Sequence, residues 1–131
     1  MEAKWGLIPD MGATITLREL VRIDVAKELT FTGKIIDGTQ AESLGLVTRT
    51  CEDPMTEAMK VAKDIVSKSP DSVAAAKVMY QKSWFASEKD CLELETEIQK
   101  RLLYSWNQMA ASGKNFGVDL SYKDRRDFDT V

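Results

Sequence analysis

Proton transfer in this chain has to rely on side chains other than histidine. The 131-residue sequence contains no histidine, which excludes Ser-His-Asp triads, Cys-His pairs and imidazole acid/base chemistry. Carboxylates, lysines, tyrosines and water remain as proton carriers. The two cysteines, Cys51 and Cys91, lie forty positions apart and form no Cys-x-x-Cys pair. Their spacing predicts neither a thiolate metal site nor a disulfide framework, and it favours reduced thiols in an intracellular protein.

The composition is that of one modest globular domain. Hydrophobic residues make up 44% of the chain and charged residues 30%, with 18 basic side chains, 21 acidic side chains and a net charge of -3. The basic residues are spread along the length, so the sequence has no electrostatic footprint for nucleic acid. No apolar run approaches the roughly 18 residues of a transmembrane helix, and the N-terminus lacks a signal-peptide pattern. We therefore expect a cytoplasmic protein without nucleic-acid or membrane partners.

Two cap-plus-proline signals mark helix starts in the second half of the chain. Asp53-Pro54 and Ser69-Pro70 each pair an N-cap residue with a proline suited to the first helical position. They predict one helix that ends near Lys68 and a second, alanine-rich helix that runs to about Trp84. The apolar spacing of the second helix predicts which side chains point inward: Val73, Ala76 and Tyr80.

The segment after residue 86 is also expected to be helical. Ser87 can cap a third and longest helix, because apolar residues repeat at spacings of three and four until Gly113. A fourth, short helix is expected to carry Phe116 and Leu120. Amphipathic helices in succession must bury their apolar stripes on each other or on a neighbouring subunit.

The first fifty residues have weaker signals. Apolar spacing predicts two short helices broken around Arg22-Ile23, and Asp37 with Gln40 three residues later resembles a capping box for a short helix that ends at Gly45. The segment Leu46–Thr50 is rich in β-branched residues and is the one convincing strand. Since a single short strand is not stable by itself, we expect that the chain begins in the middle of a fold.

Four motifs in one register follow along the chain: Glu2 with Gly6-Leu7, Pro9, Gly12 and Thr14; Ala26 to Gly33, which reads A-K-E-L-T-F-T-G; Ala41 followed by Gly45-Leu46-Val47; and Ser69-Pro70 followed by Lys77. Together they resemble the crotonase (enoyl-CoA hydratase/isomerase) superfamily, from the segment that begins at its catalytic glutamate to about Trp84. The chain departs from the superfamily pattern at Ala13, where a glycine is usual, and at Gly38, where an alanine is usual.

The resemblance implies the C-terminal half of a crotonase-like ββα spiral, mostly α with a short β element. Residues 1–68 would be the C-terminal part of the core, with the first half missing, and residues 69–131 a helical oligomerisation region that packs subunits into a homotrimer or hexamer. In the superfamily, the first half carries the acyl-CoA entry strands, both backbone amides of the oxyanion hole and the other acidic residue of hydratases. We therefore expect the 131-residue chain alone to be inactive.

The resemblance assigns proton transfer to Glu2. Hydration or isomerisation of an enoyl thioester passes through an enolate, so the site needs amide donors for the thioester oxygen and a carboxylate that moves protons. Glu2 matches that carboxylate. If the neighbouring Trp5, Leu7 and Ile8 shield it from water, its pKa rises above the ordinary value of about 4.3.

Asp10 has two interpretations that the sequence leaves open. Hydratases of the superfamily generally have glycine at this position, whereas dienoyl-CoA isomerases place an aspartate eight residues after the glutamate, as in this chain. Two carboxylates on opposite sides of a conjugated chain can remove a proton at one end and return one at the other. Alternatively, Asp10 forms a Pro-Asp turn and caps the helix that follows.

Lys123, Arg125 and Arg126 resemble the basic residues with which C-termini of the superfamily approach the phosphates of CoA; a solvated, charged tail is the alternative. The implied substrate is an acyl-CoA thioester, and no metal or other cofactor is expected. The resulting prediction is hydration or double-bond isomerisation of an enoyl- or dienoyl-CoA, as in fatty-acid β-oxidation. The alternative from another class is a catalytically inactive, truncated helical assembly module.

Overall fold

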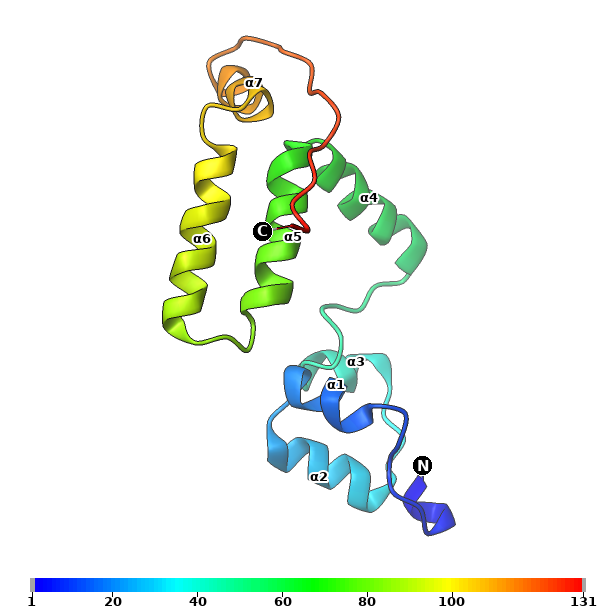
Figure 1. Ribbon diagram of the computed structural model, residues 1–131. Helices are drawn as coiled ribbons and strands as arrows, with labels where there is room; N and C mark the ends of the chain where they lie inside the picture. The colour runs from blue at the N-terminus through cyan, green and yellow to red at the C-terminus, as the bar shows by residue number, and fades with distance from the viewer. Residues whose placement is uncertain (1, 131) are drawn as a thin grey trace. The chain divides into compact units, whose positions relative to one another are not determined.

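Helices account for nearly all regular structure in the computed structural model, which describes residues 2–130 (Figure 1). The chain divides into two units, one up to Glu57 and one from Ala58 onward. The described residues contain no β-strand. The mostly helical class is thus confirmed.

The first unit contains a short 3-10 helix and three α-helices: η1 (Glu2–Trp5), α1 (Ala13–Leu20), α2 (Ile23–Thr32) and α3 (Gly38–Ser43). The break predicted around Arg22-Ile23 is confirmed, because α1 ends before Arg22 and Arg22 is the N-cap of α2. The capping box is confirmed as well. The carboxylate of Asp37 accepts a hydrogen bond from the Gln40 backbone N–H at 2.8 Å, and the Gln40 side chain accepts one from the Asp37 N–H at 3.3 Å.

The strand predicted for Leu46–Thr50 is wrong, because residues 46–48 form bends and residues 49–50 have irregular backbone. A strand needs a partner that satisfies its backbone N–H and C=O groups. Here the Thr50 N–H donates instead to the carboxylate of Glu42, eight residues earlier, at 2.8 Å. A side chain of the preceding helix has taken the place of a partner strand.

Longer helices follow, of which the first begins in the last residues of the first unit and continues into the second. The expected starts are confirmed: α4 spans Pro54–Val66, and α5 spans Pro70–Ser83 with its N-terminus capped by Ser69. Two further helices follow, α6 (Glu88–Leu102) and α7 (Trp106–Asn115). Ser87 caps α6, as the sequence predicted.

The single long helix predicted from Ser87 to Gly113 is wrong, because the chain breaks between α6 and α7. Tyr104 adopts a left-handed conformation with φ of +60°, and Ser105 starts a new helix by accepting a hydrogen bond from the Gln108 N–H at 3.4 Å. The apolar spacing of three and four continues across the break, which hid it in the sequence. Residues 118–128 have no helix, so the fourth helix predicted at Phe116 and Leu120 is also wrong.

The core of the second unit includes a residue from the segment after α7. Ala75 and Val78 of α5, Ile98 of α6 and Phe128 form one buried cluster. The segment that carries Phe128, drawn in red in Figure 1, runs beside α5. The buried stripe of α5 is Asp71, Ala75 and Val78, so the predicted inward face was wrong: Val73 and Tyr80 are exposed. The stripe is rotated because the buried Asp71 binds the C-terminal segment.

Candidate functional site

Glu2 lies in η1 with an exposed side chain, and its neighbours Trp5, Leu7 and Ile8 are exposed too. Backbone hydrogen bonding at Glu2 itself holds the pKa of its carboxyl below the ordinary value. The expectation that apolar neighbours shield Glu2 and raise its pKa is therefore wrong for this structure. An ionised, solvated carboxylate at neutral pH can accept a proton, but it lacks the desolvation that strengthens a base.

Asp10 is exposed and lies on the segment between η1 and α1, after the η1 helix that contains Glu2. The backbone oxygen of Asp10 accepts a hydrogen bond from the Ala13 N–H at 3.1 Å. The N-cap position of α1 belongs to Gly12, with φ of +81° and no side-chain capping bond. The side chain of Asp10 therefore does not cap α1. Both candidate carboxylates belong to the first unit and precede α1.

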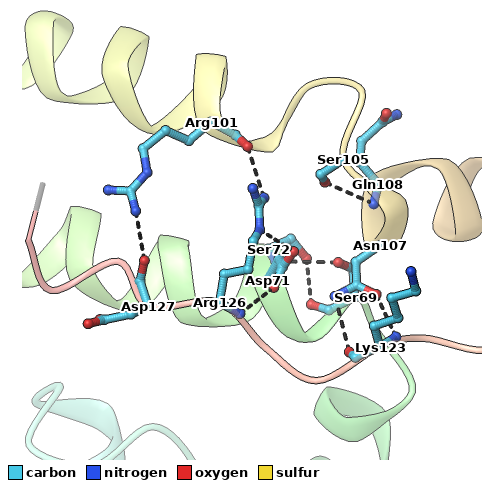
Figure 2. Close-up of polar contacts among 10 residues, drawn as sticks. All are labelled: Ser69, Asp71, Ser72, Arg101, Ser105, Asn107, Gln108, Lys123, Arg126 and Asp127. Atoms are coloured by element: carbon cyan, nitrogen blue, oxygen red, sulfur yellow. Dashed lines mark hydrogen bonds and ion pairs between the residues drawn. The ribbon is translucent and has the colours of Figure 1, made fainter.

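The three basic candidates near the C-terminus have different surroundings, and Figure 2 shows two of them, Lys123 and Arg126. Lys123 is fixed by Asn107, which accepts from the Lys123 backbone N–H at 2.8 Å and donates to its carbonyl at 3.1 Å. The Lys123 ammonium lies 4.5 Å from the ring centre of Trp106, at the start of α7. A cation over an aromatic face is favourable, so Lys123 helps to hold this segment against α7.

Arg126 joins the segment to α5 and α6. Its backbone N–H and its Nε atom donate to the two carboxylate oxygens of Asp71 at 2.8 and 2.9 Å, and its terminal nitrogen donates to the Arg101 carbonyl at 2.9 Å (Figure 2). The Asp71 side chain is only 2% exposed. A buried carboxylate with two charge-assisted hydrogen bonds is a strong anchor.

The electrostatics of Asp71 reflect two opposed effects. Burial by itself raises the pKa of the Asp71 carboxyl, whereas hydrogen bonds from the Arg126 N–H, the Arg126 guanidinium and the Asn107 side chain lower it. The hydrogen bonds prevail, and the pKa lies below its ordinary value. Asp71 is therefore ionised at neutral pH and paired with Arg126.

Arg125 is the one basic candidate of the three that lines a described cavity. The cavity has a volume of about 400 Å³ and lies between the end of α4 and the first turns of α5. Lys68 and Lys77 line it together with Arg125. The three basic candidates thus do not form one cluster: Lys123 and Arg126 anchor the segment, and Arg125 faces a cavity.

The first unit has its own cavity, of about 380 Å³, between α1 and α2. Most of its lining is apolar, including Leu17, Val21 and Phe31, with Arg18 and Lys27 among the lining residues. Within residues 2–130, no group of three or more Cys, Asp and Glu side chains is arranged to hold a metal ion. None of the described helices is long and apolar enough to cross a membrane.

The profile of the enoyl-CoA hydratase/isomerase family matches residues 1–129. The chain belongs to this family. Curated relatives include a carnitinyl-CoA dehydratase of Citrobacter koseri, 32% identical over 61% of this chain and 31% of the relative. A trans-2-decenoyl-[acyl-carrier-protein] isomerase of Streptococcus mutans is 31% identical over 76% of this chain and 39% of the relative. A carnitinyl-CoA dehydratase of Escherichia coli is 26% identical over 96% of this chain and 48% of the relative.

Solved structures of the family share the fold. A probable enoyl-CoA hydratase/isomerase from Mycobacterium abscessus superposes with a TM-score of 0.81 at 26% identity, covering 92% of this chain and 51% of that one. An enoyl-CoA hydratase from Polaromonas sp. JS666, at 23% identity, has a TM-score of 0.77 and covers 95% and 49% of the two chains. The chain spans at most about half the length of these relatives.

Sequence reasoning missed two residues, Asp71 and Asn107, that hold the C-terminal segment in place. Asp71 follows Ser69-Pro70, where an acid in a first helical turn is ordinary, so its burial gave no signal. Asn107 looked like one polar residue within an amphipathic repeat. Their partners lie far away in the sequence, and that separation hides such contacts from local patterns.

Proposed function

We propose that the chain takes part in hydration, dehydration or double-bond isomerisation of an α,β-unsaturated acyl thioester. The family match over residues 1–129 is the observation that carries this proposal. One relative is named as a dehydratase of a CoA ester and another as an isomerase of an acyl-carrier-protein ester. Both reactions move protons on carbons conjugated with a thioester carbonyl. The family match does not favour the inactive assembly module.

Glu2 is proposed as the group that moves the proton. Its lowered pKa keeps it ionised at neutral pH, so it starts the reaction as a base. In isomerisation it takes a proton from the carbon chain while the thioester oxygen acquires negative charge, and it returns that proton at another carbon. In hydration it takes a proton from the water that attacks C3 and delivers that proton to C2 of the enolate. Donors to the developing oxyanion must be supplied in both reactions.

Asp10 is proposed as a second carboxylate that acts in dienoyl isomerisation. A conjugated diene offers two ends for proton exchange, so an acid at one end and a base at the other shift both double bonds. Two observations support this proposal. Asp10 follows Glu2 by eight residues, and its side chain is not engaged as the N-cap of α1, because Gly12 occupies that position. In the simplest scheme, hydration needs only one of the two carboxylates, and this carboxylate activates the water.

The 131-residue chain by itself is proposed to be inactive on enoyl-CoA. Its candidate base is solvated, and loss of even one oxyanion donor costs about a hundredfold or more in turnover. An assay of the purified chain with crotonyl-CoA tests this point. Turnover near the enzyme median of about 10 per second would contradict it.

The roles of the carboxylates are best tested in a chimera that joins this chain to the half of the Escherichia coli relative that it does not cover. In an active chimera, Glu2→Gln should abolish turnover while CoA binding stays nearly unchanged, because the amide keeps the shape but cannot accept a proton. Glu19→Gln, on the exposed surface of α1, is the matched control and should leave activity intact. Full activity of Glu2→Gln would refute the assignment.

Asp10→Asn in the same chimera separates the two reactions. If Asp10 is the second proton carrier, 3,5-dienoyl isomerisation should fall by orders of magnitude, while hydration falls much less. Melting temperature should barely change, because the Asp10 side chain caps no helix. Dienoyl isomerisation that survives in Asp10→Asn would remove Asp10 from the mechanism and leave a hydratase or isomerase that depends on Glu2.

A further inference from the structure

Met11 lies in a turn whose backbone conformation is unusual for methionine. Its φ is +53°, and the next residue, Gly12, has φ of +81° and ψ of +10°. The Ala13 N–H donates to the Asp10 carbonyl at 3.1 Å and closes the turn. Two successive positive φ values are typical of a type I′ turn, whose first central residue is ordinarily asparagine, aspartate or glycine. Methionine at this place is sterically strained.

Several hydrogen bonds join this turn to α1. The Gly12 carbonyl accepts from the Ile15 N–H at 3.0 Å and from the Thr16 N–H at 3.1 Å. The Thr16 hydroxyl donates to the same oxygen at 3.3 Å. Together with the bond that closes the turn, these contacts fix the backbone that follows Met11. The start of a helix therefore sets where the Met11 side chain lies.

No contact in the described part of the chain compensates for the strain at Met11. Its side chain is 100% exposed. Met55 is exposed as well, but it lies within helix α4 and has no positive φ. Strained residues that their surroundings hold in place cluster at binding and catalytic sites. The combination at Met11 therefore indicates a contact with a molecule outside this chain.

The location of Met11 indicates which molecule that is. Met11 directly follows Asp10, so a substrate within reach of both Glu2 and Asp10 passes this turn. Pro9 and Thr14, on the two sides of the turn, line the mostly apolar cavity between α1 and α2. A methionine side chain is unbranched, polarisable and able to adapt to irregular apolar shapes. The part of an acyl thioester that matches these properties is its alkyl tail.

We propose that Met11 is a specificity-determining residue that contacts the alkyl tail of the unsaturated acyl thioester and favours long tails over short ones. The proposal rests on the proposed function, because it requires the substrate to lie beside Glu2 and Asp10. Met11 carries no proton in this scheme. The strained turn directs its side chain away from the chain's own surface and toward the substrate.

Chain-length selectivity in the chimera tests the proposal. The quantity to measure is kcat/KM for trans-2-decenoyl-CoA divided by kcat/KM for crotonyl-CoA, which has almost no tail. Met11→Asn should lower this ratio about tenfold and leave kcat/KM for crotonyl-CoA within about twofold, because the polar amide loses the apolar contact with the tail. Met11→Leu stays apolar and should keep the ratio within about threefold. Met55→Asn, at the other exposed methionine, is the matched control and should not change the ratio.

A second measurement needs no turnover. The full chain is labelled at the methionine methyl groups, and the Met11 signal is identified by its loss in Met11→Leu. Titration with decenoyl-pantetheine, a thioester without the nucleotide, should shift the Met11 signal in a saturable way. Crotonyl-pantetheine at the same concentrations should not shift it, and the Met55 signal should stay in place with both probes.

Three outcomes would overturn the role of Met11. An unchanged ratio in Met11→Asn, with a raised melting temperature, would show that Met11 only shapes the turn. An equal loss with both substrates would show that the turn positions Asp10 and does not select the tail. A Met11 signal that decenoyl-pantetheine leaves in place would exclude the contact. Turnover of crotonyl-CoA by the chimera tests the proposed function separately, so that function can survive each of these results.

Discussion

At the residue scale, the buried carboxylate of Asp71 anchors the C-terminal segment through Arg126. Its carboxylate is 2% exposed and pairs with Arg126, whose side chain is 44% exposed. Removal of one partner from such a pair leaves a charged group without its hydrogen bonds. Because solvent can reach the guanidinium of Arg126, the penalty should be smaller than for a fully buried pair.

Asp71→Asn is therefore expected to lower the free energy of unfolding by about 2 kcal/mol. Urea denaturation monitored by circular dichroism measures this change. Asp119→Asn, an exposed carboxylate in the same C-terminal segment, is the control and should change stability by less than about 0.5 kcal/mol. Equal stability of Asp71→Asn and the wild type would show that the anchor contributes nothing.

The lowered pKa of Asp71 also predicts a pH dependence. A carboxyl with a folded-state pKa below its unfolded-state value stabilises the fold above about pH 4, and this contribution disappears as the pH falls through the folded-state pKa. Other carboxylates contribute as well, so the informative quantity is the difference between wild type and Asp71→Asn. That difference should shrink when the pH is lowered below about 4. A difference that stays constant down to pH 2 would contradict the prediction.

At the scale of the elements, the turn between α6 and α7 contains local strain. Tyr104 has φ of +60° and an 85% exposed side chain. Residues other than glycine, asparagine and aspartate are sterically strained in this conformation. The exposed Tyr104 ring buries little surface that could offset this strain. Tyr104→Asn should raise the free energy of unfolding by about 0.5 to 1 kcal/mol. Thermal denaturation measures the effect.

The control for this prediction is Phe116→Asn. Phe116 is also an exposed aromatic residue after a helix, but its φ is -104°. Its replacement removes a similar side chain without relieving strain, so no gain in stability is expected. If both substitutions stabilise the chain equally, loss of exposed aromatic surface and not backbone strain is the cause.

The elements predicted correctly are those whose signals are local. Ser69, Ser87 and the Asp37–Gln40 pair act within three residues, so sequence order alone reveals them. The break at Tyr104 was missed because apolar periodicity continues through it. The strand at Leu46–Thr50 was predicted from β-branched residues, but a strand also needs a partner in space, and β propensity cannot supply one.

The candidate site was predictable to a smaller degree. Glu2, Asp10 and the basic residues of the C-terminal segment were identified by resemblance, and their catalytic and binding roles stay predictions. The contacts that decide their environment join distant residues, such as the Arg126–Asp71 pair separated by 55 positions. The pKa of Glu2 was expected to rise because apolar neighbours in sequence were taken as neighbours in space, and they are not.

At the scale of the whole molecule, the two units differ in how much they bury. Among residues 2–57, Gly33 alone is buried, whereas the second unit buries the cluster around Ala75, Ile98 and Phe128. Local unfolding is easiest where few apolar contacts are made. Backbone amides of α2 should therefore exchange hydrogen with solvent at least about tenfold faster than those of α5. Hydrogen exchange followed by mass spectrometry measures both, and equal protection would contradict this expectation.

Self-association is a second prediction at this scale. Aromatic side chains at the end of α5, from Tyr80, Trp84 and Phe85, are exposed, and exposed apolar patches mark interaction surfaces. We expect homotrimers or hexamers, which light scattering would detect as multiples of three times 14.7 kDa. Trp84→Glu should dissociate them, while Gln81→Glu, an exposed control on the same helix, should not. A monomeric wild-type chain at micromolar concentration would refute the prediction.

The closure of the second core by Phe128 also has a consequence for biosynthesis. A ribosome makes Asp71 and Ala75 well before Arg126 and Phe128, and Arg126 follows Asp71 by 55 residues. At about 5 to 20 residues per second, synthesis of these 55 residues takes roughly 3 to 11 seconds. The nascent α5 lacks its covering segment during this time. During that interval the ionised Asp71 gives the otherwise apolar stripe a hydrated charge, which opposes aggregation of the growing chain until the segment with Arg126 arrives and neutralises it.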